Sequence, residues 1–231
     1  MTHSNPTPEP TPRLATPATT VGPAATAGVV QQLGAAAVFF TSGGALVVHI
    51  LTDATLPIVF AGLLVGGGIL ALRARPDPAA RAGMVPVLKV GLVAGLVSTV
   101  VYDLSRYAIK WAFHLHASPF KALPYFGEAL VGAEAGSTAS WVAGVVFHVT
   151  NGVCFGIGYT VLAGRRPLPW AVAFGLGLEA CMLALYPSWL QIAAMREFTE
   201  ISLLGHVAYG VTLGLVTNRL LPASSTPSEQ D

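Results

Sequence analysis

The chain has 231 residues, of which 53% are hydrophobic and 10% charged, and its mean hydropathy is +0.65. This composition leaves too little polar surface for a water-soluble globule, so we expect lipid to surround most of the chain. The formal net charge of +1 and the lack of a basic stripe argue against nucleic acid as a partner. Cys154 and Cys181 lie within apolar runs without C-x-x-C spacing, which argues against a disulfide framework or a thiolate zinc site.

The N-terminal segment, residues 1–28, is rich in proline, threonine and alanine. Such a segment cannot bury enough apolar surface to offset the entropy of ordering, so we predict a disordered tail on the cytoplasmic side. It lacks a charged region followed directly by an apolar one, which excludes a signal peptide and leaves the first helix as the targeting signal. Residues 223–231 are predicted to form a second disordered tail, and 29–222 the transmembrane domain.

Six apolar stretches follow, each near the ~20 residues that an α-helix needs to cross the hydrocarbon of a bilayer. They lie at about 30–51, 55–74, 86–113, 139–163, 168–187 and 201–221. The apolar patch at 129–132 is too short to cross, so 114–138 is predicted to be a long outer loop with room for a surface helix. The sequence therefore predicts an all-α, polytopic transmembrane helix bundle of six helices, multi-pass in the plasma (inner) membrane.

The distribution of basic residues predicts the orientation of the bundle, because cytoplasmic loops of membrane proteins retain positive charge. With six helices, the basic residues that flank the second and fourth connections and the two ends all fall on one side. These residues are Arg13, Arg73, Arg75, Arg81, Lys89, Arg165, Arg166 and Arg219. We therefore expect both termini in the cytoplasm and the other three connections outside.

The fourth and sixth predicted helices share the pattern H-V-x-x-G-V-x-x-G, which begins at His148 and at His206. Positions i, i+4 and i+8 lie along one face of a helix, so each helix presents a histidine in line with two glycines. Glycines at this spacing permit close helix contact in lipid. Because one helix separates the two, both run in the same direction, which predicts an internal repeat of parallel units in a core of the third to sixth helices.

Two acidic residues, Asp103 and Glu179, lie deep in the apolar runs that precede the histidine helices. At 1.5 Å per residue, the depths of Asp103, His148, Glu179 and His206 below the outer surface agree within roughly 8 Å. A charged side chain in hydrocarbon is costly, so such residues normally face a bundle interior or a wet cavity. We expect the four side chains to share one layer, as catalytic groups or as metal ligands.

Two imidazoles and two carboxylates suit a divalent transition metal, which is one candidate cofactor, and they equally suit a proton relay. Asn151 and Tyr209 are candidates for binding a substrate or for orienting the site. The competing interpretations are structural. Asp103 can pair with Arg106 or Tyr107 one turn along its own helix, and each histidine can hydrogen-bond a neighbouring backbone.

The repeated H-x-x-x-G-x-x-x-G helices, the intervening helix with Gly175-Leu176-Gly177-Leu178-Glu179 and the glycine-rich third helix carry a resemblance. Through them, residues 86–221 resemble an uncharacterised family of small polytopic membrane proteins from bacteria and archaea. The resemblance implies the four-helix core and leaves the first two helices outside it. The family has no assigned activity, so the resemblance implies no reaction and no substrate.

Three classes of function remain open from the sequence. The first is a small membrane enzyme, or a proton- or metal-handling protein, that uses the polar layer under the cover of 114–138. The second is a carrier for a small solute or ion, which with so few core helices would work as a homo-oligomer. The third is a non-catalytic membrane subunit or assembly factor, in which the layer only specifies helix packing.

Overall fold

The computed structural model describes residues 33–73 and 78–222, and the regular secondary structure of these residues is entirely helical. Both predicted tails, 1–28 and 223–231, therefore lie outside the described residues. A short helix, Leu33–Phe39, leads into the main elements. These are α2 (Thr41–Thr52), α3 (Leu56–Arg73), α4 (Pro78–Ala112), α5 (Ala122–Val131), α6 (Thr138–Ala163), α7 (Leu168–Trp189) and α8 (Met195–Leu220).

Five helices are long and apolar enough to cross a membrane: α3, α4 from Ala82 onward, α6, α7 and α8. A sixth crossing requires Leu33–Phe39 and α2 together, and these two are bent by 61° relative to each other. The sequence predicted one continuous helix here. At the bend the Thr41 hydroxyl donates to the Val38 carbonyl over 2.8 Å, a side-chain bond that competes with the helical ladder.

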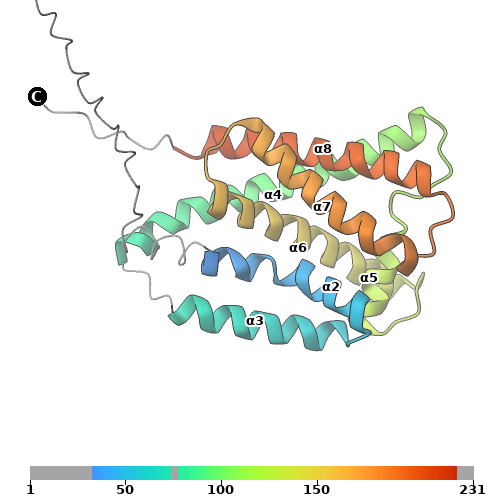
Figure 1. The fold of residues 1–231 in the computed structure, drawn as a ribbon, viewed down its shortest axis with the longest axis horizontal. Helices are drawn as coiled ribbons and strands as arrows, with labels where there is room; N and C mark the ends of the chain where they lie inside the picture. Colours follow the sequence, from blue (N-terminus) through green and yellow to red (C-terminus); the bar gives the residue numbers. More distant parts are fainter. Residues whose placement is uncertain (1–32, 74–77, 223–231) are drawn as a thin grey trace, which may run out of the picture.

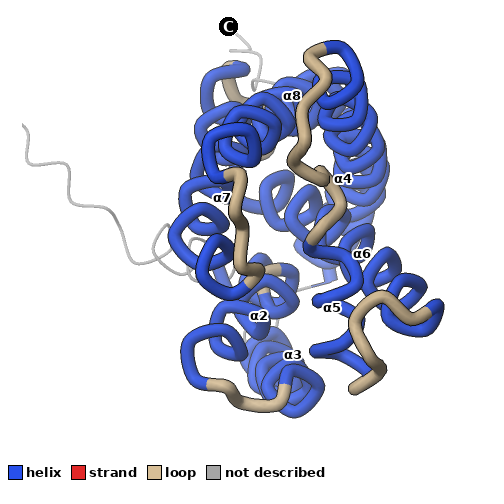
Figure 2. Tube along the Cα trace, turned by 90° about the vertical axis from the view of Figure 1, so that its right-hand side faces the viewer, coloured by secondary structure: helices blue, strands red, loops and turns tan. Residues whose placement is uncertain are grey.

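The helices run back and forth along the long axis of the molecule (Figure 1). The α4 helix lies between α6 and α8, while α7 packs on α8 and α5 packs on α6. The hairpin of α2 and α3 lies beside this group, as the end-on view shows (Figure 2). The core is therefore built from α4, α6, α7 and α8, in which α4 contacts two histidine-bearing helices at once.

Glycines bring the core helices into backbone contact. A Cβ atom on Gly156 of α6 would clash with the backbone of Gly95 of α4, and a Cβ on Gly95 would lie 2.7 Å from the Val153 carbonyl oxygen. In the second pair, a Cβ on Gly210 of α8 would lie 2.5 Å from the Ala171 carbonyl oxygen of α7. Such distances are shorter than van der Waals contact allows, so the helices can cross this closely only with glycine at these positions.

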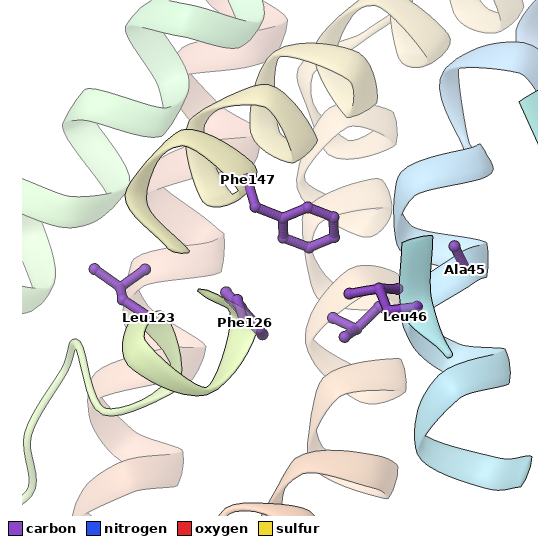
Figure 3. Close-up of a cluster of buried hydrophobic side chains, with 6 residues drawn as sticks. Ala45, Leu46, Leu123, Phe126 and Phe147 are labelled. Carbon is purple, nitrogen blue, oxygen red and sulfur yellow. The ribbon is translucent and has the colours of Figure 1, made fainter. Parts of the chain in front are cut away.

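The α5 helix occupies the middle of the predicted outer loop, but it is not a freely exposed surface helix. It packs on α6 where Gly127 lies against the Ser140 backbone and Gly144 against the Leu123 backbone. Its inner side chains join a buried cluster that reaches across to α2 (Figure 3). The cluster consists of Ala45, Leu46, Leu56, Leu123, Phe126 and Phe147. The α5 helix therefore closes one end of the bundle against α2 and α6.

Candidate functional site

The two acids and two histidines expected from the sequence form two separate pairs. The His148 Nε2 atom of α6 lies 3.1 Å from each carboxylate oxygen of Asp103 in α4. The His206 Nδ1 atom of α8 lies 2.7 Å from Oε2 of Glu179 in α7. No group of three or more His, Cys, Asp or Glu side chains among the described residues is arranged to hold a metal ion. This geometry does not gather the four side chains into one metal centre, which was one of the alternatives that the sequence left open.

The Tyr102 side chain separates the two pairs. Its ring centroid lies 6.0 Å from that of His148 and 4.7 Å from that of His206. Successive residues on an α-helix point about 100° apart, so α4 can direct Asp103 toward α6 and Tyr102 toward α8. Tyr102 was not among the site residues expected from the sequence, because its role depends on the central position of α4.

The pair of Glu179 and His206 is almost fully enclosed. Glu179 is 1% exposed, and its Oε2 atom accepts a hydrogen bond from the Ser202 hydroxyl over 2.8 Å. The His206 Nδ1 atom also lies 3.1 Å from the Ser202 carbonyl oxygen. The two oxygens around Nδ1 are acceptors, which favours the tautomer with the proton on Nδ1 and leaves Nε2 as the other ring nitrogen of His206.

The pair of Asp103 and His148 is more open, with side-chain exposures of 27% and 18%. The local ion pair with Arg106, weighed as a structural alternative for Asp103, is not among the ion pairs of the described residues. Asp103 turns to α6, whereas Arg106 is packed elsewhere. Tyr107, the other local candidate, is 58% exposed on the outside of the bundle.

Arg106 is a buried cation that sequence reasoning treated only as a partner of Asp103. It is 6% exposed, and its guanidinium carbon lies 4.7 Å from the Tyr102 ring centroid and 6.0 Å from that of Phe120. Its Nε atom has no hydrogen-bond partner among the described residues. The sequence signal that could have identified Arg106 as a site residue is its position six residues before the end of an apolar helix.

A cavity of about 370 Å³ lies between α2, α4, α5, α6, α7 and α8. Most of its wall is apolar, and its polar side chains come mainly from α4, α6 and α8. These include Tyr102, Arg106, His148, Asn151, His206 and Tyr209. Neither Asp103 nor Glu179 lines the cavity. Each histidine therefore faces the cavity while its carboxylate partner supports it from behind.

Asn151 and Tyr209, the residues expected to bind a substrate or to orient the site, both line this cavity. The Asn151 Oδ1 atom accepts a hydrogen bond from the Ser42 hydroxyl of α2 over 2.7 Å. The Tyr209 hydroxyl donates to the Gly152 carbonyl of α6 over 2.8 Å. Both side chains therefore tie a neighbouring helix to α6 at the cavity wall.

Comparison with known proteins places the core of the chain in a family. Residues 85–228 match the model of a family of unknown function, DUF6789. The match begins within α4, includes all of α5 to α8, and covers more than half of the chain. No curated protein and no solved structure matches the chain. This chain belongs to the DUF6789 family, a family of unknown function.

Proposed function

We propose that this membrane protein binds a small molecule in its cavity and exchanges protons with it through His148 and His206. One observation carries the proposal: both histidines line the same cavity, and a carboxylate that does not line it stands behind each. A histidine oriented by a carboxylate is the usual arrangement of a general acid or base.

The two pairs leave one ring nitrogen of each histidine for this chemistry. Glu179 and the Ser202 carbonyl hold Nδ1 of His206, so Nε2 is its exchanging atom. Asp103 holds Nε2 of His148, so Nδ1 is its exchanging atom. In each pair the carboxylate stabilises the imidazolium that forms when the histidine takes up a proton. Ionisable groups kept within a membrane-spanning bundle commonly serve such proton transfer.

A carrier is the second candidate, and the helix packing favours it over a structural subunit. In the helix pairs α4–α6 and α7–α8, the first helix carries the acidic residue and the second carries the histidine. The second glycine of each motif lies against the residue eight positions before the acid: Gly156 against Gly95, and Gly214 against Ala171. This equivalence supports an internal repeat of two parallel hairpins. Carriers often place a binding site between such repeats, and this one would work as a homo-oligomer.

The proposed setting is the plasma membrane, with six crossings and both termini on the cytoplasmic side. Three basic residues support it: Arg73 ends α3, Arg165 lies between α6 and α7, and Arg219 lies in the last turn of α8. These helix ends lie at the same end of the bundle (Figure 1). Excess positive charge at one end is typical of the cytoplasmic face.

Calorimetry on protein in lipid nanodiscs tests the proposed function. Compounds that share a ten-carbon chain but carry a carboxylate, phosphate, amine or hydroxyl group are titrated in two buffers of different ionisation enthalpy. We expect at least one to bind saturably with net proton exchange. The exchange should disappear when His148→Gln and His206→Gln are combined, and binding should be lost in Leu178→Trp, whose larger side chain fills part of the cavity. Saturable binding without proton exchange in the unmodified protein, or no binding of any compound, would overturn the proposal.

A further inference from the structure

We infer that Arg106 makes the cavity a site for an amphipathic carboxylate, with the carboxylate on the guanidinium and the hydrocarbon tail along the apolar wall. This inference rests on the proposed function, because it names the class of molecule that enters the same cavity. The evidence is that Arg106 is buried and that its Nε atom has no hydrogen-bond partner among the described residues. Arg106 takes no part in the proton exchange proposed for the two histidines.

Arg106 is a buried charge whose nearest candidate partners bind elsewhere. Asp103, three residues away on the same helix, is held by His148, and Oε2 of Glu179 is held by His206 and Ser202. Oε1 of Glu179 has no hydrogen-bond partner among the described residues, but no ion pair there joins Glu179 to Arg106. The Tyr102 ring attracts the guanidinium, but its face supplies no oxygen acceptor for the N–H groups. A buried charge without an acceptor is costly, and an anion in the cavity would supply the acceptor that Nε of Arg106 lacks among the described residues.

The charges around the cavity also favour an anion. The titratable neighbours of Arg106 come from every core helix. They are Tyr102 and Asp103 of α4, His148 of α6, Glu179, Cys181 and Tyr186 of α7, and His206 and Tyr209 of α8. Each of the two carboxylates lies against a histidine: Asp103 against His148, and Glu179 against His206. Arg106 has no counterion among the ion pairs of the described residues, so it is the charged group that an added anion would pair with.

The cavity shape and the single cation select a carboxylate with an apolar tail. A guanidinium forms two parallel hydrogen bonds with a carboxylate, and one monoanion neutralises it. A phosphate dianion would leave a second charge buried without a partner. The cavity volume of about 370 Å³ is within the range of small-molecule pockets. Aromatic and aliphatic side chains such as Phe120, Leu123 and Phe155 supply the wall for a tail.

Binding of decanoic acid to protein in nanodiscs tests this assignment, with decanol, decylamine and decyl phosphate as matched probes. We expect decanoate to bind best. Arg106→Gln should weaken its binding roughly tenfold or more, the factor expected for a lost charge-assisted pair. Arg106→Lys should retain part of the affinity, because an ammonium keeps the charge but not the planar fork. Arg196→Gln is the matched control, since Arg196 is exposed and pairs with Glu200.

Thermal unfolding without added ligand gives a second readout. Arg106→Gln should leave the melting temperature unchanged or raise it, because it removes an unpaired buried charge. Mass spectrometry of extracted lipids distinguishes the source of the ligand: a fatty acid drawn from the membrane should copurify with the unmodified protein and not with Arg106→Gln. A carboxylate drawn from water should instead bind when added and leave no copurified acid.

The outcomes separate this inference from the proposed function. Equal decanoate binding by the unmodified protein and Arg106→Gln would overturn the carboxylate assignment, as would preference for decylamine or decanol. If one of those probes still binds saturably with proton exchange, the proposed function stands alone. If none of the probes binds, both fail.

Discussion

Asp103 and Glu179 each pair with a histidine, but their surroundings differ in a way that determines how much each pair contributes to stability. The Glu179 side chain is 2% exposed, whereas the Asp103 side chain is 27% exposed. Glu179 also accepts from Ser202, so its removal takes a carboxylate partner from both His206 and Ser202. Asp103, in contrast, accepts from His148 alone among the described residues, so its removal affects one partner.

We therefore expect Glu179→Ala to lower the free energy of unfolding by about 3 kcal/mol, because it leaves His206 buried without its partner. Asp103→Ala should cost only about 1 kcal/mol, since it removes a single, less buried interaction. Equilibrium unfolding in mixed detergent micelles measures both. Glu128→Ala, at an exposed position of α5, is the control and should have little effect. Equal losses for the two acids would contradict the difference in burial.

At the scale of elements, close helix crossings hold the acid and histidine helices at pairing distance. A Cβ on Gly156 would meet the Gly95 backbone, and α4 would have to move away from α6. Nothing lies within 4 Å of a Cβ placed on Gly177 of α7. The same substitution therefore has opposite consequences at two glycines of the same bundle.

Gly156→Ala should destabilise the protein by about 1 to 3 kcal/mol, the range for overpacking a tight contact. Gly177→Ala should be neutral or stabilise by up to about 1 kcal/mol, because alanine is the better helix former. Thermal melting of both variants in the same detergent compares them directly. A larger loss for Gly177→Ala than for Gly156→Ala would contradict the crossing described for α4 and α6.

The α5 helix makes a separate prediction, because it depends on Gly127 and Gly144 to lie against α6. Gly144→Val should push α5 outward and loosen the cavity wall formed by Leu123 and Phe126. In a background with Cys154 and Cys181 replaced by alanine, a water-soluble maleimide should then modify Leu46→Cys, a buried position on the cavity wall, faster than in the parent. Gly66→Val in α3 has open space around it and should leave the rate unchanged.

At the scale of the whole molecule, the number of crossings decides which connections share a side of the membrane. In the proposed arrangement the α5–α6 and α6–α7 connections face opposite sides. In a chain with Cys154 and Cys181 replaced by alanine, a cysteine at Ala135 should react with an impermeant reagent added outside intact cells. A cysteine at Arg166 should react only after the cells are opened. Labelling of Arg166→Cys from outside would contradict the orientation.

The sequence by itself determined the solvent of this protein and the identity of its polar residues. Hydropathy is a local property, so the apolar runs could be located without knowing their neighbours, and α3, α6 and α7 begin and end within two residues of the predicted limits. The glycine pattern that begins at His148 and at His206 likewise identified the two helices that carry the histidines, α6 and α8. Both predictions follow from spacing along a single helix.

Only the tertiary structure decided which polar groups meet. Lipid is as apolar as a helix interface, so hydropathy does not encode how the helices are arranged laterally or rotated. The structure places α4 between α6 and α8, which divides the expected layer into two pairs and inserts Tyr102 between them. The same rotation turns Arg106 from Asp103 toward the cavity. Backbone contacts at glycines set these rotations, and such contacts join residues far apart in the sequence.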